Sequence, residues 1–281
     1  MEPGEFRRAS HAVWEAMAPG WERQYSWFEE LARPVTERMV EALRVEPGTR
    51  VLELAAGAGI VGLTAAQALG DGTQLILSDF SPAMVEAARR RGSELGLDNV
   101  DYRVLDAEAL ELPDESVDGV LCRWGYMLMG DPAKALAETH RVLRPEGRVS
   151  AAVFASAQQN PWAALPMQIL VEGGFVPPPG PGQPGILSLA DPEGLRALFA
   201  DAGFEDVEID AVAFRWPFED DEDYWRFLTE MAGAISMALS GLDEDARAGV
   251  RDELGRRLEP FRGHDGVELG AVSLVISASR G

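Results

Sequence analysis

Short apolar runs alternate with amphipathic patterns through the middle of the chain. The runs have the length of strands, and several are apolar on both faces, as is typical of parallel strands covered by helices on each side. They lie at residues 50–55, 73–79, 100–106, 117–124 and 147–154. Patterns with helical spacing separate them at 60–69, 82–96 and 132–143. This alternation predicts an α/β fold built on a doubly wound, mostly parallel sheet.

Three of the expected helices begin with a capping signal. Ser81, Asp131 and Asp191 are each followed directly by proline. The side-chain oxygen of a capping residue accepts a hydrogen bond from a free backbone N–H group, and proline at the first helical position has no N–H group to leave unpaired. We therefore expect helices to begin at these three residues.

The two ends of the chain are less regular. Residues 6–45 predict two or three helices rich in aromatic residues, and 156–190 predict a short helix followed by a Pro- and Gly-rich segment. The other expected elements are a helix at 191–202, a strand at 206–217, acidic helices at about 220–239 and 243–259, and a strand at 268–280. Because the late helices lie between two strands, we interpret them as an insertion in a single domain.

The composition narrows the range of partners. The chain has 25 basic and 47 acidic residues, a net charge of −22, which repels the phosphates of nucleic acids. Cys122 is the only cysteine and the three histidines are far apart, so we expect no metal site. The N-terminus lacks the apolar stretch of a signal peptide, and no run of 18 apolar residues occurs. We expect a cytoplasmic protein that acts on neither nucleic acid nor membrane.

A loop of small residues follows the first apolar run. In VLELAAGAGIVG (51–62) an expected strand leads through this loop into a helix, and small residues allow a ligand to approach the backbone closely. Gly57, Gly59 and Gly62 form a G-x-G-x-x-G string, and Asp79 follows about 20 residues later, as in dinucleotide-binding proteins. The string alone fits NAD as well as S-adenosylmethionine.

Three acidic residues distinguish between these ligands. Glu53 lies inside the first expected strand, where a carboxylate needs a polar partner, and Asp79 and Asp106 end the second and third strands. The carboxyl ends of parallel strands meet at one edge of a sheet, where ligands bind. Three acids at this edge can bind three parts of a ligand that joins a nucleoside to an amino acid, which favours S-adenosylmethionine.

These motifs resemble those of the class I S-adenosylmethionine-dependent methyltransferases, within them the branch of ubiquinone/menaquinone-biosynthesis C-methyltransferases and their small-molecule relatives. The resemblance covers about residues 20–155, and Ala55 stands where the family has a glycine. It rests on the strings ELAAGAG, SDFSPAMVEAARRR, VLDAEALELPDESVDGVLC and RVLRPEGRV. It implies a Rossmann-like, seven-stranded, mostly parallel sheet, with S-adenosylmethionine as cofactor and S-adenosylhomocysteine as product.

The resemblance assigns the methionine half of the cofactor to the glycine loop. It implies that Ala55, Ala56, Gly57 and Gly59 wrap around this half. Glu53 would support the ammonium group indirectly.

The nucleoside half of the cofactor would lie farther along the same edge. The resemblance implies that Asp79 accepts hydrogen bonds from both ribose hydroxyls and that Phe80 and Met84 pack on the adenine. Asp106 would accept a hydrogen bond from the adenine amino group, and the backbone N–H of Ala107 would donate to a ring nitrogen.

Arg123 follows the fourth apolar run and would contact either the methionine carboxylate or the methyl acceptor. Members that methylate adenine or glutamine carry an Asn/Asp-Pro-Pro-aromatic string at this place, but residues 122–131 are bulky and apolar. This difference favours in-line methyl transfer to a small, largely apolar or aromatic acceptor. His11 and Tyr25 are the candidates for a general base, and the site of methylation on carbon, oxygen or nitrogen stays open.

The family pattern also implies a division of the single domain 1–281. Residues 1–45 would form a helical lid and 46–155 the cofactor-binding core, with acceptor-covering insertions at 156–190 and 218–262. The apolar last strand leaves room for a homodimer. Three other functions stay open. One is a non-catalytic module that binds S-adenosylmethionine or S-adenosylhomocysteine, and another is an NAD-dependent oxidoreductase, although the chain lacks a Tyr-x-x-x-Lys pair. The third is a protein methyltransferase, which the acidic edge covered by insertions disfavours.

Overall fold

The apolar runs form one sheet in the computed structural model, which describes residues 3–70, 72–180 and 182–281, with the backbone alone for 3–7 and 9. The strands follow the order β3-β2-β1-β4-β5-β8-β6, and a short β7 pairs with β8. They are β1 (Arg50–Glu53), β2 (Gln74–Asp79), β3 (Val100–Val104), β4 (Val117–Arg123), β5 (Leu143–Phe154), β6 (Phe204–Phe218), β7 (Arg262–Gly263) and β8 (Gly266–Arg280).

The direction of the strands creates the binding edge. From β3 to β5 all neighbouring strands are parallel, and β8 runs antiparallel between β5 and β6. The chain order reverses at β1, which pairs with β2 on one side and with β4 on the other. A crevice opens at the carboxyl ends of the strands at such a point. All seven predicted strands are confirmed; β7 was not predicted, because two residues carry no periodic pattern.

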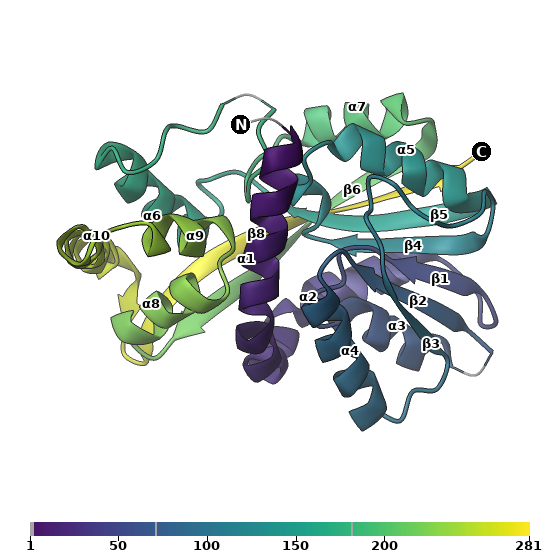
Figure 1. Ribbon diagram of the computed structural model, residues 1–281, viewed down its shortest axis with the longest axis horizontal. Coiled ribbons are helices and arrows are strands. Elements are labelled where there is room, and N and C mark those ends of the chain that lie inside the picture. Colours follow the sequence, from purple (N-terminus) through teal and green to yellow (C-terminus); the bar gives the residue numbers. More distant parts are fainter. Residues whose placement is uncertain (1–2, 71, 181) are drawn as a thin grey trace.

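Helices cover both faces of the sheet. Figure 1 shows α5 and α7 on one side and α2, α3 and α4 on the other. Strands β6 and β8 extend beyond the sheet toward a group formed by α6, α8, α9 and α10, and α1 contacts both α4 and α8. The helices are α1 (Pro3–Arg23), α2 (Tyr25–Leu43), α3 (Ile60–Leu69), α4 (Pro82–Glu94), α5 (Pro132–Val142), α6 (Pro161–Glu172), α7 (Pro192–Asp201), α8 (Asp221–Glu230), α9 (Ala234–Ser240) and α10 (Glu244–Arg257), with 3-10 turns η1 (Tyr126–Leu128) and η2 (Glu259–Phe261).

The three predicted helix starts are confirmed together with their chemistry. Ser81, Asp131 and Asp191 cap α4, α5 and α7, and each side chain accepts a hydrogen bond from the backbone N–H three residues later. In each case the proline occupies the first helical position, where its missing N–H group costs nothing. The capping signals therefore predict the first residue of each of these three helices.

The acidic helix expected at about 220–239 is two helices. Helix α8 ends at Glu230 and α9 begins at Ala234. Gly233 between them has a φ of 46°, a left-handed conformation that favours glycine and that cannot continue a right-handed helix. The break matters for function, because residues 231–234 reach the cavity described below.

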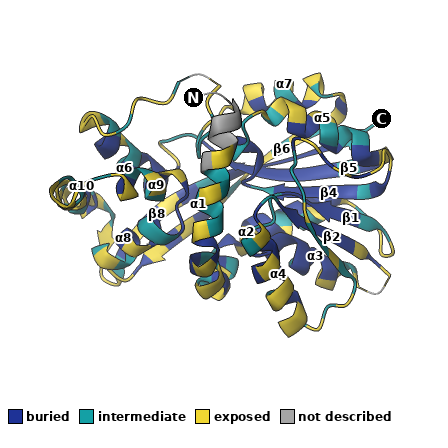
Figure 2. Cartoon of the chain, viewed as in Figure 1, coloured by how far each residue is buried: buried dark blue, intermediate teal, exposed yellow. Residues whose placement is uncertain are grey.

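The core follows the sheet. Figure 2 shows the central strands β4 and β5 buried along most of their length, whereas the outward faces of the surrounding helices are exposed. Strand β3 at the sheet edge contains no fully buried residue. None of the helices in the described ranges combines the length and apolarity needed to cross a bilayer.

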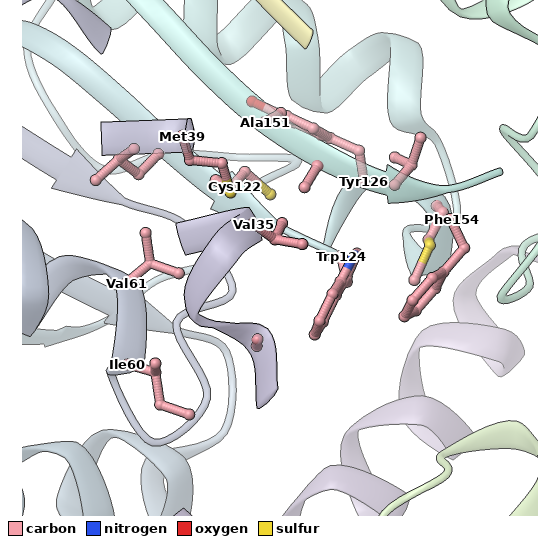
Figure 3. Close-up of a cluster of buried hydrophobic side chains, with 14 of the residues drawn as sticks. Val35, Met39, Ile60, Val61, Cys122, Trp124, Tyr126, Ala151 and Phe154 are labelled. Carbon is pink, nitrogen blue, oxygen red and sulfur yellow. The ribbon is translucent and has the colours of Figure 1, made fainter. Parts of the chain in front are cut away.

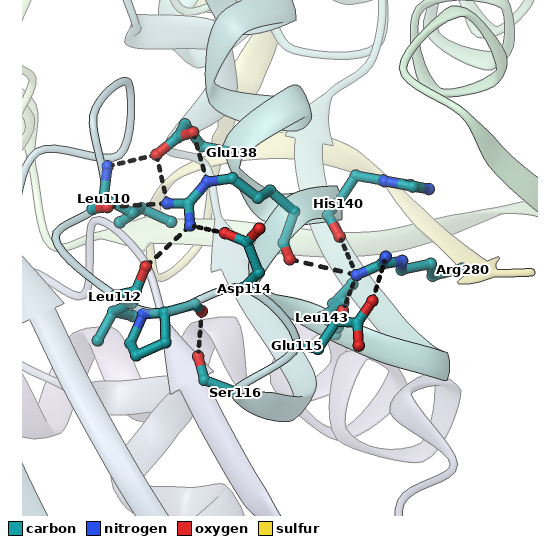
Figure 4. A network of polar contacts seen from close by, with 11 residues as sticks. Leu110, Leu112, Asp114, Glu115, Ser116, Glu138, His140, Leu143 and Arg280 are labelled. Carbon is teal, nitrogen blue, oxygen red and sulfur yellow. Dashed lines mark hydrogen bonds and ion pairs between the residues drawn. The ribbon is translucent and has the colours of Figure 1, made fainter.

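Arg141 organises the loop that leads from β3 to β4 (Figure 4). Its guanidinium donates to both carboxylate oxygens of Glu138 at 2.9 and 2.8 Å and to Asp114 at 2.7 Å. It also donates to the backbone carbonyls of Leu110 and Leu112 at 2.9 and 2.8 Å. Only arginine supplies this many donors from one planar group. The string RVLRPEGRV thus holds a neighbouring loop in place.

We expect Arg141→Met to lower the free energy of unfolding by about 2 kcal/mol, because it leaves two loop carbonyls without this donor and removes the positive charge that pairs with Glu138 and Asp114. Urea denaturation measures this loss. Arg144→Met is the matched control, since Arg144 forms a half-exposed ion pair with Asp118 that is worth less than about 1 kcal/mol. Equal losses in the two variants would contradict the assigned role of Arg141.

Candidate functional site

A cavity lies at the carboxyl edge of the sheet. The last residues of four parallel strands line it: Glu53 of β1, Asp79 of β2, Arg123 of β4 and Phe154 of β5. Side chains from α1, α2, α6, α8 and the end of β6 complete its walls. The cavity therefore sits where the topology predicts a ligand.

The loop after β1 forms one end of the cavity. Its backbone turns through left-handed conformations at Ala55 (φ 49°), Gly57 (54°) and Gly59 (84°). Ala55 adopts this conformation at a cost, since its Cβ atom disfavours it, which explains why a glycine suits this position. Ala56 anchors the loop by donating from its N–H to the carbonyl of Ser78 at 2.9 Å.

Gly59 differs from Ala55, Ala56 and Gly57, because it does not line the cavity. A Cβ atom at this position would lie 2.8 Å from Leu77 Cδ1 and 3.0 Å from Ala88 Cβ. The missing side chain therefore allows the N-terminus of α3 to approach β2 and α4. The geometry gives Gly59 a packing role.

Asp79 connects the loop to α4. One carboxylate oxygen accepts from the N–H of Gly57 and the other from the N–H of Ser81, both at 2.9 Å. Asp79 is 6% exposed, and burial raises its pKa to about 6 against the opposing effect of these N–H donors. Each carboxylate oxygen can accept a second hydrogen bond, so Asp79 retains acceptor capacity on the cavity side.

Glu53 lies beneath the loop and is 1% exposed. Its Oε2 atom has no hydrogen-bond partner, and a Cβ atom on Gly62 would lie 2.2 Å from it. Burial raises the pKa of Glu53 to about 8, although the positive charge of Arg123 acts in the opposite direction. A buried carboxyl group with an oxygen that lacks a partner is costly to ionise, and a cation placed close to it would lower its pKa.

Arg123 lies between the glycine loop and the far wall of the cavity. Its guanidinium carbon is 5.3 Å from the ring centre of Phe28 and 4.7 Å from that of Trp124. One of its nitrogens donates to Thr36 Oγ1 at 2.9 Å. Burial lowers the pKa of Arg123 to about 10, against the charge of Glu53, so the side chain stays positive at neutral pH.

The loop after β3 forms the side of the cavity next to Asp79. Asp106 was expected to end the third strand. In the structure β3 ends at Val104, and Asp106 lies in the loop that follows. The carboxylate of Asp106 accepts from the N–H of Glu108 at 2.9 Å, and Leu105 donates to the carbonyl of Asp79 at 3.1 Å. Asp106 still reaches the cavity, as expected.

Aromatic side chains form the opposite end of the cavity. Figure 3 shows Trp124 beside Phe154, and the two rings stack with centres 4.6 Å apart. Trp124 has a left-handed φ of 56°, a strained conformation that its packing against Phe154 and its hydrogen bond to Ser273 maintain. We call the following residues the aromatic wall: Trp21, Phe28, Trp124, Phe154, Trp162, Trp216 and Phe227.

Ten of the eleven residues predicted to bind the cofactor line this one cavity. They are Glu53, Ala55, Ala56, Gly57, Asp79, Phe80, Met84, Asp106, Ala107 and Arg123. The sequence did not single out Ser10, Trp14, Phe28 or Phe154 as site residues, although they line it too. The sequence alone does not distinguish an aromatic residue that lines a cavity from one that lies in the hydrophobic core.

The two candidate bases lie outside the cavity lining. His11 packs edge-on against Phe80, with ring centres 5.4 Å apart. Tyr25 is buried, and burial raises the pKa of its hydroxyl well above the ordinary value. The lining residues in the described part of the chain include no histidine, lysine or tyrosine.

Comparison with known proteins identifies the family. Residues 51–147 match the family model described as a methyltransferase domain. The ubiquinone/menaquinone biosynthesis C-methyltransferase UbiE of Cronobacter sakazakii is 30% identical over 178 residues, which cover 60% of this chain and 71% of that protein. UbiE of Pseudoalteromonas translucida is 36% identical over 117 residues, covering 41% of this chain and about half (47%) of that protein.

Solved structures share the fold. The YcgJ protein of Bacillus subtilis superposes with a TM-score of 0.59 at 19% identity, over 87% of this chain and 97% of that one. Phosphoethanolamine N-methyltransferase 2 of Haemonchus contortus, solved with S-adenosyl-L-methionine, gives 0.54 at 18% identity, over 88% of this chain and 52% of that one. The sheet, the glycine loop and these relatives agree: the chain belongs to the class I methyltransferases, enzymes that use S-adenosylmethionine as methyl donor.

Proposed function

We propose that this enzyme methylates a small, largely apolar or aromatic molecule, which binds against the aromatic wall. The observation that carries the proposal is that one cavity is lined both by the glycine loop, with the acids Glu53 and Asp79 beside it, and by the aromatic wall. The UbiE relatives, named for C-methylation in ubiquinone and menaquinone biosynthesis, support a small acceptor.

The glycine-loop end fits the donor. The partnerless Oε2 of Glu53 suits a positively charged group above the loop, and the free acceptor capacity of Asp79 suits two hydroxyls. Within this proposal Ala55, Ala56 and Gly57 surround the methionine half, and Gly59 supports the loop from behind.

The adenine would lie between α4 and the loop after β3. Phe80 and Met84 supply apolar surface on one side, while Asp106 and the backbone of Ala107 supply polar groups on the other. Helix α1 closes this region, because Glu15 accepts from Ser81 Oγ at 2.6 Å and from the N–H of Ala83 at 3.1 Å. We propose that the N-terminal helices act as the lid of the site and that the segments 156–190 and 218–262 cover the acceptor.

The chain itself contributes orientation and exclusion of water. When bound, S-adenosylmethionine supplies a methyl group on a positively charged sulfur, which is already electrophilic. The aromatic wall can hold a planar molecule in one orientation and keep water out, and such positioning accounts for much of the acceleration in bimolecular reactions. Among the residues that the structure describes, the lining contains no histidine or tyrosine that could act as a base, and we assign none.

Titration calorimetry with S-adenosylhomocysteine, with NAD as the control ligand, tests the donor half of the proposal. We expect micromolar binding of S-adenosylhomocysteine and none of NAD. The acceptor half is tested by incubating the enzyme with S-adenosylmethionine and a panel of phenolic and polycyclic compounds, with mass detection of methylated products. Binding of NAD, or methylation confined to large or strongly polar acceptors, would overturn the proposal.

A further inference from the structure

Glu108 joins two loops that both line the cavity. It lies in the loop after β3, where its backbone N–H donates to the carboxylate of Asp106 at 2.9 Å. Its own carboxylate reaches the loop after β4, where Oε1 accepts from the N–H groups of Gly130 and Asp131 at 2.9 and 3.2 Å. The Glu108 residue is 6% exposed, and hydrogen bonds to a buried carboxylate are strong because water competes little for them. Glu108 is therefore a direct link between the two loops.

The loop after β4, residues 124–131, depends on contacts from outside. Most of it lines the cavity. It begins at the strained Trp124, and a strained residue keeps its conformation only where the surrounding structure enforces it. The regular structure within it is the single turn η1. A segment with so little regular structure opens at low cost, and the two bonds to Glu108 restrain its far end.

The same loop holds part of the proposed cover of the acceptor. The carbonyl of Met127 accepts from the N–H of Gly185 at 2.9 Å and from Ser188 Oγ at 2.8 Å. Between these two residues, Ile186 lines the cavity. Hydrogen bonds thus connect the loop after β3, through the loop after β4, with residues 185–188.

We propose that Glu108 is a positioning residue that couples the two binding steps, so that donor bound at the loop after β3 orders the loop after β4 and residues 185–188 for the acceptor. Because the proposed function places the adenine against Asp106 and Ala107, this coupling rests on it. An adenine held by these two residues restricts the loop after β3, and Glu108 transmits the restriction. Coupling between two binding sites is reciprocal, so the acceptor strengthens binding of the donor by the same factor.

Hydrogen exchange with and without saturating S-adenosylhomocysteine, measured by mass spectrometry, tests the coupling without any acceptor. In the parent protein we expect the ligand to slow exchange of the backbone N–H groups at 106–109 and, by at least about fivefold, at 185–188. In Glu108→Ala the slowing at 185–188 should disappear while that at 106–109 remains. Glu108→Gln should restore it, because the amide oxygen can accept from the same two N–H groups.

Glu138→Ala is the matched control. The carboxylate of Glu138 also holds the loop after β3, since Oε2 accepts from the N–H of Leu110 at 2.7 Å, but Glu138 lies on α5 and outside the cavity lining. We expect this variant to lose stability and to keep the slowing at 185–188. Glu108→Asp keeps the charge and retracts the carboxylate by one methylene group, so it replaces Glu108→Ala if that variant does not fold.

Equilibrium dialysis with 2-acetylnaphthalene as the acceptor probe measures the consequence for binding. The parent protein saturated with S-adenosylhomocysteine should bind the probe at least about fivefold more tightly than the protein without it. In Glu108→Ala this ratio should be at least halved, and in Glu108→Gln and Glu138→Ala it should be that of the parent.

The outcomes for the coupling and for the proposed function are distinct. Slowing at 106–109 without slowing at 185–188 in the parent protein would overturn the coupling alone. An unchanged pattern in Glu108→Ala, or the same loss in Glu138→Ala, would also overturn it. Binding of S-adenosylhomocysteine without slowing at 106–109 would overturn the placement of the adenine and the coupling with it. Failure of the naphthalene to bind would overturn the apolar acceptor site, while the exchange pattern would still decide the coupling.

Discussion

Asp79→Ala will weaken binding of S-adenosylhomocysteine by at least about tenfold, and by roughly 100-fold if both ribose hydroxyls donate to this carboxylate. The variant removes a charged acceptor at the end of β2 and also the bond that holds the N–H of Gly57. Titration calorimetry measures the change.

The control for this variant is Asp101→Ala. Asp101 lies on the neighbouring strand β3 and pairs with Arg103 at 2.6 Å, outside the cavity lining. It should bind S-adenosylhomocysteine like the parent protein. Unchanged affinity in Asp79→Ala would remove the carboxylate from the donor site.

The raised pKa of Asp79 predicts how the binding of S-adenosylhomocysteine depends on pH. Burial raises the pKa of Asp79 to about 6, so the fraction of protein with an ionised acceptor falls as the pH drops below that value. Affinity for S-adenosylhomocysteine should therefore decrease between pH 7 and pH 5. In Asp79→Ala this part of the pH dependence should be absent.

Glu53 should make the ligand-free protein less stable as the pH rises from 5 to 8. Its pKa is about 8 in the folded chain against 4.5 as the ordinary value, so over this range the folded state holds a proton that the unfolded state has lost. Stability then falls by up to about 1.4 kcal/mol per pH unit, because the unfolded state binds fewer protons. Urea denaturation at pH 5, 6.5 and 8 measures the slope.

Glu53→Gln supplies the test of this assignment. The amide cannot ionise, so the slope attributed to Glu53 should disappear and the variant should be more stable than the parent protein at pH 8. It should also bind S-adenosylhomocysteine more weakly, because an amide cannot ionise when the ligand's ammonium group approaches, as the Glu53 carboxyl can. A variant with the parental slope would show that other groups cause the pH dependence.

The core of the fold could be predicted because its signals are local. Strands β1, β2 and β4 and the second half of β5 are compact, mainly apolar runs, and three helices carry their caps in the sequence. The glycine loop and the acids Glu53 and Asp79 follow strand ends, so topology alone brings them together. Boundaries that depend on a single backbone angle, such as the break at Gly233, gave no such signal.

The sequence predicts that aromatic residues are available for an acceptor pocket, Trp21, Trp124, Trp162, Trp216 and Phe227 among them, but it does not show which of them line the cavity, because they come from distant parts of the chain. Phe28 lies on α2, Phe154 ends β5 and Trp216 lies on β6, and only the packing of α1, α2 and α8 against the sheet brings such residues together.

A crystal structure of the protein with S-adenosylhomocysteine and 2-acetylnaphthalene tests the central claim most directly. We predict that the ribose lies at Asp79, that the sulfur faces the aromatic wall, and that the naphthalene packs against Trp124. A naphthalene bound elsewhere, or a sulfur atom facing away from the aromatic wall, would contradict the claim that one cavity brings donor and acceptor together.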